Sequence, residues 1–507
     1  MIIFAPIMSI TGIIRPIMVR RALGALRASE RPEQTQRAVL ARLLSMARGT
    51  EVIAESGLGT GAGYEEFREA MEPGEYEKIR GKVMRMIGGE KNVLWPGRCR
   101  WFAQSSGTSD GRSKYIPVTD DSLRLNHYGG ASQAVAHYLL HHPESRVFDG
   151  KALILGGSFN TGAEPPRPKG VRVGDLSATL ISRITPLAEL VRVPSRRVAL
   201  MGDWREKLPA LVKAASVARV SNLSGVPSWM LTVVRGVLEH TGASTLNEVW
   251  PDLEVFFHGG IGFEPYREQY ESITDNRKMN FVNTYNASEG FFAVQNDPDD
   301  AAMLLLLNQG VFYEFQNQEG EIFPAWEVNE GEIYSLVITA PNGLWRYPVG
   351  DTVKIESTAP LKISIAGRTK SYINAFGEEL MVHNADAALA RTCHELGCTV
   401  ENYTAAPVYT TARHHGRHEW LVEFGKAPES VERFAERLDY YLTQENSDYA
   451  AKRAHNIFLD RLTVVEAPPG LFDRWLGRNG GKLGGQRKIP RLSNDRTVID
   501  SMLKMND

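Results

Sequence analysis

The chain has 507 residues, which is too long for one hydrophobic core and predicts two or three domains. Apolar residues make up 43% and charged residues 23%, as in ordinary soluble globular proteins, so a disordered or fibrous chain is excluded. The 58 lysines and arginines nearly balance the 60 aspartates and glutamates, and the formal net charge is −2. This balance argues against a protein built to coat nucleic acid or an anionic membrane, because both require a basic surplus.

The first segment, residues 1–14, is apolar and uncharged but contains Pro6 and Gly12. A helix that spans a membrane needs about 20 apolar residues. A secretory signal carries its positive charge before the apolar run, whereas the arginines here follow it. We therefore expect a packing segment without stable membrane insertion, and contact with a membrane is the alternative.

The three cysteines, Cys99, Cys393 and Cys398, are too few for a disulfide framework. The closely spaced pair near residue 395 lacks the second pair that a zinc ribbon needs. We expect three reduced thiols in a cytoplasmic protein.

Residues 16–95 are predicted to be mainly helical. Apolar residues recur at helical spacing between residues 32 and 48, where Pro32 suits a first turn. A second helix is expected over residues 73–87.

From residue 101 onward, short apolar runs end in glycine-rich or polar turns and alternate with helices such as residues 121–142. This pattern predicts an α/β fold, with β-sheets flanked by helices and ligand loops at strand ends. The predicted strands are residues 101–103, 152–155, 253–257, 281–285 and 333–339.

Residues 370–507 have their own alternation of helices and strands and the size of a small domain. The predicted elements are helices near 384–396 and 430–441 and a strand near 420–424. We therefore expect a large domain over residues 1–369 and a smaller α/β domain over residues 370–507.

The most informative motif is the loop from Ser105 to Lys114, with the sequence Ser-Ser-Gly-Thr-Ser-Asp-Gly-Arg-Ser-Lys. Its two glycines permit tight turns that present N–H groups, its five hydroxyls add donors, and its last lysine adds a positive charge. Polyphosphates need such donors and cations. The spacing differs from a Walker A loop, and a solvated Ser/Gly turn is the structural alternative.

Two further motifs carry carboxylates. Residues 285–290, Tyr-Asn-Ala-Ser-Glu-Gly, follow a predicted strand and combine an aromatic ring that can stack on a base with a carboxylate that can hold Mg²⁺. Residues 345–351, Trp-Arg-Tyr-Pro-Val-Gly-Asp, are predicted to place Asp351 at a loop tip, where it can accept hydrogen bonds from a ribose. Each motif alone also fits an ordinary turn.

Two basic motifs complete the series. Arg368 and Lys370 follow Gly367 at the predicted domain junction, and Lys482 and Lys488 lie in a glycine-rich stretch near the C-terminus. A lysine in such a loop can be carried into a distant site, and a basic flexible tail is the alternative.

In this order, the motifs resemble the adenylate-forming superfamily of acyl-CoA synthetases, firefly luciferase and adenylation domains. Within it, Ser-Ser-Gly-Thr-Ser-x-Gly-x-x-Lys and Tyr-x-x-Ser-Glu resemble the auxin-responsive acyl acid amido synthetases, the plant Gretchen Hagen family and its bacterial relatives. The long helical N-terminus and Gln-Arg-Lys-Ile-Pro-Arg are similar too, so the resemblance spans nearly the whole chain. It implies a large N-terminal domain that binds ATP and the acyl acid and a mobile C-terminal lid.

The resemblance also implies roles for individual residues. The ATP phosphates would lie against Ser105, Ser106, Gly107, Thr108, Ser109 and Lys114. The adenine would lie near Tyr285, Ala287 and Ser288, with Gly259 and Gly260 close by. Glu289 would reach Mg²⁺, and Asp351 would hold the ribose hydroxyls. Arg368 would lie near the ribose, with Lys370 as hinge, and Lys488 would contact phosphate, with Lys482 as the second candidate.

The implied reaction has two steps: a carboxylic acid and ATP give an acyl-adenylate and pyrophosphate, and an amino acid then displaces AMP to form an amide. One departure from the family pattern is Pro348, where the family often has arginine, so Arg346 or another residue would have to substitute. The partners expected are thus small molecules, with no nucleic acid.

Alternatives remain at this point. The same activation can end in a thioester with coenzyme A, or the protein can bind nucleotide without turnover. A hydrolase would use the Gly-x-Ser-x-Gly string at residues 107–111, and a metal could bind the histidine pairs at 137/141 and 414/418, but neither has convincing partners. His258 either lines the nucleotide pocket or packs at a strand end. Candidates for the acyl pocket are Asn126, Tyr128, Ala131 and the stretch 222–229.

Overall fold

The computed structural model describes residues 9–59, 61–105, 114–159, 165–275, 277–368, 372–409, 415–454, 459–478 and 489–505. The chain forms two compact units. Unit 1 comprises residues 1–105, 114–263 and 270–369, and unit 2 comprises residues 106–113, 264–269 and 370–507. The assignment of residues 1–369 to substrate binding and of residues 370–507 to a mobile lid stays a prediction.

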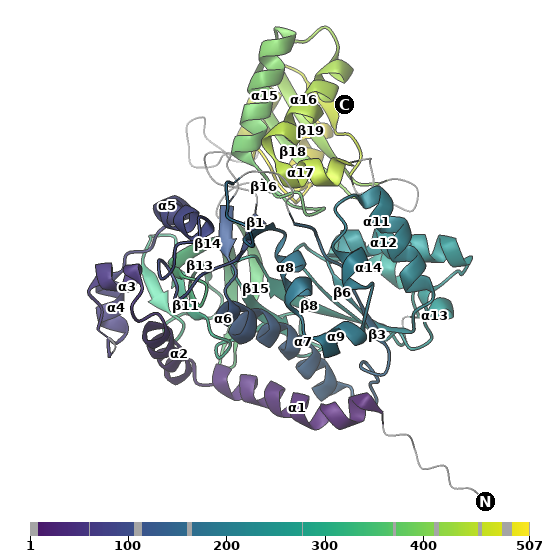
Figure 1. Cartoon of the computed structure of the whole chain (residues 1–507). Coiled ribbons are helices and arrows are strands. Elements are labelled where there is room, and N and C mark those ends of the chain that lie inside the picture. Colours follow the sequence, from purple (N-terminus) through teal and green to yellow (C-terminus); the bar gives the residue numbers. More distant parts are fainter. Residues whose placement is uncertain are drawn as a thin grey trace, which may run out of the picture. The chain divides into compact units, whose positions relative to one another are not determined.

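The N-terminal part of unit 1 is helical, as predicted, and its first helix lies along α7 (Figure 1). Pro32 begins the second helix, because its ring pre-sets a helical φ and its missing N–H has no partner in a first turn. Within the described ranges, no helix combines the length and apolar character needed to cross a membrane. The N-terminal helices are α1 (Ile10–Ser29), α2 (Pro32–Met46), α3 (Glu51–Ser56), α4 (Tyr64–Ala70) and α5 (Tyr76–Ile87).

The helix predicted over residues 121–142 is present as a helical stretch from Asp120 to His141. A π-helical turn interrupts this stretch. The elements are α6 (Asp120–Ser122), η1 (Leu123–His127) and α7 (Tyr128–His141). The remaining helices of this region are α8 (Leu176–Arg183), α9 (Pro186–Leu190), α10 (Arg196–Ala199), α11 (Trp204–Ser216), α12 (Pro227–Thr241), α13 (Leu246–Val249) and α14 (Glu264–Glu271).

Unit 1 is built on a 12-stranded sheet with the order β12-β11-β13-β14-β15-β10-β9-β8-β7-β6-β3-β5. The strands from β5 to β8 in this order pair in parallel, and those from β8 to β12 pair antiparallel. The sheet therefore changes from parallel to antiparallel at β8. Its strands are β3 (Lys151–Ile154), β5 (Arg192–Val193), β6 (Val220–Gly225), β7 (Val255–Gly259), β8 (Asn280–Asn286), β9 (Phe291–Gln295), β10 (Met303–Leu305), β11 (Phe312–Gln316), β12 (Ile322–Pro324), β13 (Ile333–Ala340), β14 (Leu344–Thr358) and β15 (Leu361–Arg368).

A second sheet has the order β2-β1-β4 and contains β1 (Trp101–Ser105), β2 (Lys114–Pro117) and β4 (Arg172–Gly174). The α/β fold class is thus confirmed, and each of the five predicted strands overlaps an observed strand.

The prediction of a loop tip at Asp351 was wrong, because this residue lies inside β14. Asp351 pairs with Arg368 of β15, and β14 pairs with β13 on its other side. Gly350 has φ +96°, and both pairings contain register shifts. The Gly-Asp sequence, which resembles a turn, therefore lies at an irregular point of a long strand. Glycine adopts the left-handed backbone conformation that this point requires.

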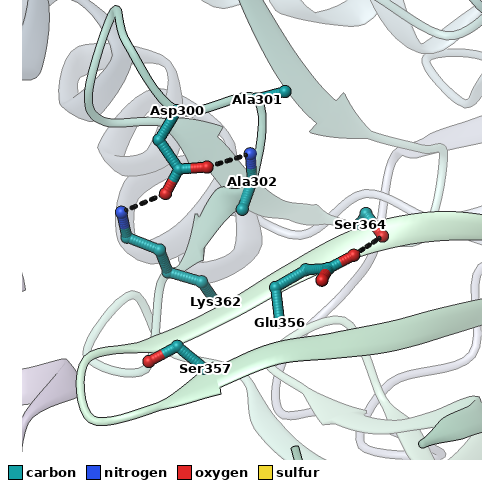
Figure 2. Close-up of a pocket in the computed structure, with 7 residues that line it drawn as sticks. All are labelled: Asp300, Ala301, Ala302, Glu356, Ser357, Lys362 and Ser364. Carbon is teal, nitrogen blue, oxygen red and sulfur yellow. Dashed lines mark hydrogen bonds and ion pairs between the residues drawn. The ribbon is translucent and has the colours of Figure 1, made fainter. Parts of the chain in front are cut away.

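A polar pocket of about 400 Å³ lies where β14 and β15 meet the loop before β10 (Figure 2). Asp300 accepts hydrogen bonds from Lys362 Nζ at 2.7 Å and from the Ala302 N–H at 2.9 Å. Ser364 Oγ donates to Glu356 at 2.6 Å. Neighbouring donors thus satisfy both carboxylates of the pocket, and the bonds from Lys362 and Ser364 lower the pKa of Asp300 and Glu356, respectively.

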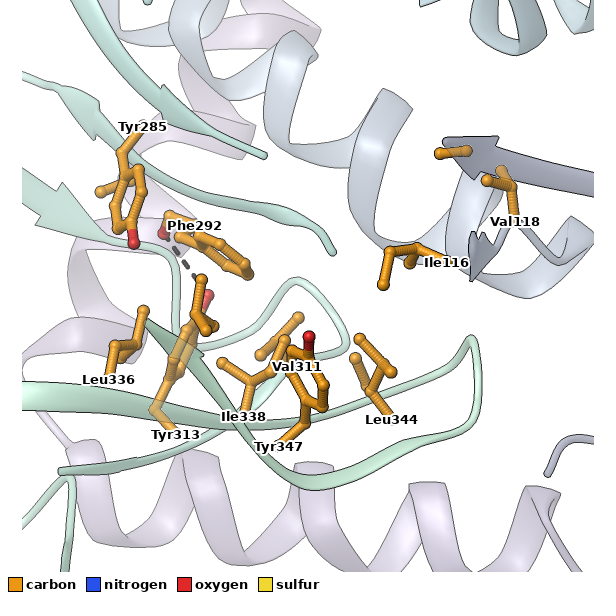
Figure 3. Packing of buried hydrophobic residues seen from close by; sticks show 14 of the residues in the cluster. Ile116, Val118, Tyr285, Phe292, Val311, Tyr313, Leu336, Ile338, Leu344 and Tyr347 are labelled. Carbon is orange, nitrogen blue, oxygen red and sulfur yellow. Dashed lines mark hydrogen bonds between the residues drawn. The ribbon is translucent and has the colours of Figure 1, made fainter. Parts of the chain in front are cut away.

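The largest core lies between the antiparallel part of the sheet, the small sheet and α5. Figure 3 shows aromatic residues of this core on neighbouring strands, with Tyr285 beside Phe292 and Tyr347 near Leu344. The rings of Tyr285 and Phe292 are 5.0 Å apart at 67°, an edge-to-face arrangement. This core supports the strands that carry the predicted nucleotide residues.

Unit 2 packs α15 and α16 on a sheet with the order β18-β19-β20. Ser430 caps α16 by accepting the Arg433 N–H. In the core of this unit, His418 Nε2 lies 2.7 Å from Glu378 Oε1, and the histidine lowers the pKa of this buried carboxyl group against the opposing effect of burial. The elements are β16 (Tyr372–Ile373), β17 (Leu380–Met381), α15 (Val382–Leu396), β18 (Thr399–Val408), β19 (Arg417–Lys426), α16 (Val431–Glu445), α17 (Ser447–Arg453), β20 (Thr463–Ala467), α18 (Leu471–Arg478) and α19 (Thr497–Leu503).

Arg346 of β14 forms a buried ion pair with Glu314 of β11. The guanidinium Nη2 donates to Glu314 Oε1 at 2.8 Å, and Nη1 donates to the carbonyl oxygens of Arg68 and Met71 at 3.0 and 2.8 Å. Tyr64 Oη donates to the same carboxylate at 3.1 Å. The pair thus joins the α4 region to two strands of the large sheet.

We predict that Arg346→Met lowers the free energy of unfolding of unit 1 by about 3–5 kcal/mol, because it leaves a buried carboxylate without its cation. Urea unfolding followed by tryptophan fluorescence measures this change. Arg205→Met is the matched control, since the Arg205–Asp203 pair is solvent-exposed and its loss should hardly move the midpoint. Equal midpoints for the two variants would contradict the prediction.

Candidate active site

The predicted phosphate loop connects the antiparallel strands β1 and β2. Ser105 and Lys114 face each other in the register of this pair. Ser106, Gly107, Thr108 and Ser109 lie outside the described residues. The β1–β2 pairing therefore brings together the two ends of the loop, and one of these ends is the predicted phosphate-binding lysine.

Lys114 reaches β14 of the large sheet. Its Nζ donates to Tyr347 Oη at 3.2 Å and lies 5.8 Å from the centre of the Tyr347 ring. The side chain of Tyr347 is buried in the main core, so it offers Lys114 a fixed hydroxyl and ring face. The loop end is thereby joined to the strand that also carries Asp351.

Tyr285 and Asp351, which were predicted from separate motifs, are in direct contact. Tyr285 Oη donates to Asp351 Oδ2 at 2.7 Å, and both residues are buried. A hydroxyl–carboxylate hydrogen bond of this length in a buried setting is strong and fixes both side chains. The contact joins β8 to β14 at the expected nucleoside position.

Glu289 lies at the tip of a tight turn between β8 and β9. The Ala287 N–H donates to the Gly290 carbonyl oxygen at 2.8 Å and the Gly290 N–H donates back to Ala287 at 3.3 Å, so Ser288 and Glu289 form the turn. Asn342 Nδ2 donates to the Glu289 carbonyl oxygen at 3.1 Å. Glu289 is buried, and its backbone is held from the β13–β14 turn.

Asn126, in the π-helical turn η1, binds the backbone of Phe291, the first residue after the β8–β9 turn that carries Glu289. Its Oδ1 accepts the Phe291 N–H at 2.7 Å and its Nδ2 donates to the Phe291 carbonyl oxygen at 2.9 Å. An added Cβ at Gly290 would come within 3.0 Å of Asn126 Oδ1, so the turn fits closely against the amide. π-Helical turns are frequent at functional sites.

Gly259 is the last residue of β7, the parallel neighbour of β8, and Gly260 follows it. A Cβ at Gly259 would lie 2.4 Å from the Thr284 carbonyl oxygen and 2.7 Å from Asn286 Oδ1, so only glycine permits this approach of the two strands. Gly260 has φ +86°, a left-handed conformation that glycine adopts without strain. Both residues lie at the carboxyl end of a parallel strand, where open α/β sheets bind ligands.

The predicted residues thus converge on β14 from two other segments. Lys114 contacts Tyr347 and Tyr285 contacts Asp351, and the two positions are about 13 Å apart along an extended strand. Arg368 pairs with Asp351 through the backbone of β15. The Arg368 side chain and residues Lys370, Lys482 and Lys488 lie outside what the structure describes.

Arg346 cannot take the place of the family arginine that Pro348 replaces. Its guanidinium is buried and fully engaged with Glu314 and two backbone carbonyl groups. Pro348 itself pairs with Val337 beside a register shift of β14, a position where a missing N–H is tolerated.

The candidates for the acyl pocket have structural contacts. Asn126 is buried on the Phe291 backbone, and Tyr128 Oη donates to the Leu180 carbonyl oxygen at 2.8 Å. Ala131 is exposed, and the ring of Trp229 contacts Trp204 edge-on at 5.8 Å. His258 is buried and stacks on Phe263 with ring centres 4.1 Å apart, which favours packing for this residue.

Three residues of this arrangement were not predicted as part of it: Tyr347, Asn342, and Asn126 in its contact with Phe291. Tyr347 precedes Pro348 in a motif chosen for Asp351, and Asn342 lies in the Pro-Asn-Gly turn after β13. Their roles depend on partners more than 50 residues away, which local patterns do not show.

In the described ranges, no group of three or more histidine, cysteine, aspartate or glutamate side chains could hold a metal ion. A cage of protein ligands is not what a nucleotide site requires, because Mg²⁺ is commonly bound by one or two carboxylates together with phosphate oxygens. The single buried carboxylate of Glu289 fits that pattern.

Comparisons with known structures show an adenylate-forming fold. The structure of "AtGH3.15 acyl acid amido synthetase in complex with 2,4-DB" superimposes with a TM-score of 0.60 at 18% identity and covers 96% of both chains. A 2-hydroxyisobutyryl-CoA ligase in complex with 2-HIB-AMP and CoA superimposes with a TM-score of 0.57 at 14% identity, covering 94% of this chain and 92% of the ligase. The chain therefore has the fold of these two ligases.

Sequence comparisons define the family. Models of the GH3 family N-terminal, central and C-terminal domains match residues 25–185, 304–368 and 383–497 and together cover more than half of the chain. The protein belongs to the GH3 family, as the motifs predicted. The probable indole-3-acetic acid-amido synthetase GH3.1 of Oryza sativa subsp. japonica is 21% identical over 92% of this chain and 88% of its own length. The indole-3-acetic acid-amido synthetase GH3.4 of Arabidopsis thaliana is also 21% identical, over 64% of each chain.

Two buried histidines of unit 1 make stability depend on pH. Burial lowers the pKa of both His127 and His137 to about 4, and His137 also lies near the charges of His141 and Lys362. In the unfolded chain each imidazole takes up a proton near pH 6.5. Below that pH the unfolded state binds more protons than the folded state, so acid favours unfolding.

We predict that unit 1 loses up to about 3 kcal/mol per histidine as the pH falls from 6.5 to 4. Urea unfolding at a series of pH values measures this loss. His137→Leu should remove its own share of the pH dependence, whereas His240→Gln, at an exposed position of α12, should leave it intact. An unchanged pH dependence in His137→Leu would show that this residue is protonated equally in both states.

Proposed function

We propose that this protein is an acyl acid amido synthetase, which activates a carboxylic acid with ATP and joins the acyl group to the amine of an amino acid. Membership of the GH3 family supports this activity. The observation that carries it to this chain is the convergence of Lys114 and Tyr285 on Tyr347 and Asp351 of β14. The phosphate-binding candidate Lys114 and the nucleoside-binding candidate Tyr285, from two separate segments, thereby contact β14, which carries the ribose-binding candidate Asp351.

The proposed nucleotide site follows this geometry. Asp351 accepts hydrogen bonds from the ribose hydroxyls, and the Tyr285 hydroxyl holds the aspartate in place. Gly259 and Gly260 leave room for the adenine beside Ala287 and Ser288. The phosphates lie against the loop from Ser105 to Lys114, whose backbone N–H groups and hydroxyls donate to their oxygens. Arg368 lies near the ribose, and Lys370 is the hinge.

In the first step, an oxygen of the carboxylate attacks the α-phosphorus of ATP and pyrophosphate leaves. Negative charge accumulates on the phosphoryl oxygens, and positioned cations and N–H donors stabilise it. Lys114 and either Lys488 or Lys482 supply the protein's cations. Glu289 would hold Mg²⁺, and the bound ion would supply positive charge for the phosphate oxygens.

In the second step, the amine of the amino acid attacks the acyl carbonyl carbon, the bond to the phosphate oxygen breaks, and AMP leaves. Water competes with the amine, so the site must exclude it. We propose that residues 370–507 form a lid that moves about Lys370 between the two steps.

A thioester-forming ligase is the second candidate function. The similar fold of 2-hydroxyisobutyryl-CoA ligase shows that this architecture also accommodates coenzyme A as the acceptor. Both candidates share the adenylation step, and only the acceptor differs. A nucleotide-binding protein without turnover is the third, and the presence of Glu289, Asp351 and Lys488 argues against it.

We also propose a cytoplasmic location, because Cys99, Cys393 and Cys398 are free thiols in the structure. The substrates are small molecules, an acyl acid and an amino acid, and no nucleic acid is involved.

The first test is ATP–pyrophosphate exchange with the purified protein, Mg²⁺ and a panel of aromatic and aliphatic carboxylic acids. We expect exchange that depends on one class of acid and falls about 100-fold or more in Lys488→Ala and Glu289→Ala, because each removes charge stabilisation of the transition state. Lys482→Ala is the matched control, and a larger loss there would make Lys482 the catalytic lysine. ATP binding without exchange for any acid would favour the protein without turnover.

The acceptor is identified by adding amino acids or coenzyme A to the active acid and following AMP release with mass detection of the product. An amide product confirms the amido synthetase. A thioester product with no amide would replace it by the second candidate.

A further prediction concerns the turn that carries Glu289. Asn126→Leu removes both hydrogen bonds to Phe291, so the turn loosens and the concentration of Mg²⁺ needed for half-maximal exchange should rise about tenfold. Asn126→Gln can restore one bond and should recover part of the loss. Gln309→Leu, at a neighbouring partly exposed residue, is the control. A fall in the exchange rate with unchanged Mg²⁺ dependence would contradict a positioning role.

A further inference from the structure

Helix α1 leaves three large aliphatic side chains exposed on one face. Ile10, Ile13 and Ile17 are 51%, 54% and 63% exposed. Their spacing of three and four residues places them in one stripe along the helix. A surface helix normally turns its largest aliphatic residues toward the core, so this stripe calls for an explanation.

The opposite face of α1 is already packed. Met18, Ala22 and Ala25 are buried in a cluster with residues of α7 such as Leu139. Arg15 fastens the helix by donating to the carbonyl oxygens of Leu139, His142 and Ser145 at 2.8–3.0 Å. The helix is therefore held to unit 1 by one face, and the isoleucine stripe does not contribute to that attachment.

The charge of this segment has one sign. Residues 1–29 contain four arginines and no aspartate or glutamate, although the whole chain is nearly neutral. By helical geometry, Arg20 and Arg21 continue the stripe beyond Ile17, one on either side of it. Both are exposed, and neither forms an ion pair with any residue in the described ranges.

We propose that the exposed face of α1 binds the surface of an anionic lipid bilayer. The isoleucines enter the boundary between headgroups and acyl chains, and Arg20 and Arg21 lie at the level of the anionic headgroups, as in helices that lie in the plane of a membrane. Such binding is peripheral and requires no spanning helix.

A second copy of this chain is a less suitable occupant of the stripe. An isologous contact would bring two such segments together, each with arginines and without a carboxylate. Anionic headgroups complement the same charge. The proposal concerns a surface of unit 1 and does not depend on the activity proposed above.

The test is co-sedimentation of the full-length protein with vesicles of phosphatidylcholine alone or with phosphatidylglycerol. We expect binding to the anionic vesicles that weakens with salt and falls at least about tenfold in Ile13→Asp/Ile17→Asp and in Arg20→Glu/Arg21→Glu. Val217→Asp is the matched control, because Val217 is 86% exposed at the end of α11. Thermal unfolding checks that all variants remain folded.

Three outcomes would overturn the proposal. These are equal binding to both kinds of vesicle, retention of anionic binding by the isoleucine variant, and a wild-type dimer, seen by sedimentation without lipid, that the isoleucine variant converts to monomer. The last outcome would make a second copy the occupant of the stripe.

Discussion

The buried pair of Arg346 and Glu314 is the constraint on which the candidate site depends. Arg346 has φ +43°, an unusual backbone conformation for a residue with a side chain, and its guanidinium is held by a carboxylate and two carbonyl groups. A buried arginine stays charged and must keep its partners, so it fixes the backbone that carries it. The next residue is Tyr347, the contact of Lys114, and Asp351 follows four residues later. The chemistry proposed for β14 thus rests on an ion pair that touches no substrate.

The site also lies where the large sheet changes character. β7 and β8 are parallel, and their carboxyl ends supply Gly259 and Tyr285. From β8 onward the sheet is antiparallel, so a tight turn can follow β8 and place Glu289 close to Tyr285. Parallel strands end at an edge where α/β sheets bind ligands, and antiparallel strands allow short turns such as the one that carries Glu289. β14 is irregular at Pro348 and Gly350, close to Tyr347 and Asp351. Such bulges often redirect side chains next to active sites.

Helix α1 carries its proposed binding residues on the exposed surface, unlike the buried residues of the candidate site. Its attachment uses one buried face, with Met18, Ala22 and Ala25, and the hydrogen bonds of Arg15, so three isoleucines of the opposite face stay exposed without weakening the fold. A stripe that contributes little to stability can be retained for binding, because large exposed apolar patches are otherwise a liability in a soluble domain. The near-neutral charge of the whole chain conceals this local excess of arginine, since composition averages over the surface.

The sequence by itself determined the α/β class and the family and indicated the candidate site residues, because hydroxyl-rich, glycine-rich and carboxylate-bearing turns are local patterns. Helices such as α2 and α16 were likewise predictable from a proline at the first turn and a serine cap. Only the tertiary structure decided that Asp351 lies in a strand, because Gly-Asp is a turn signal until two neighbouring strands pair with it. It also decided that Arg346 is structural and that Asn126 holds the Glu289 turn. Those roles depend on partners 32 and 165 residues away, which come close only when the sheet has formed.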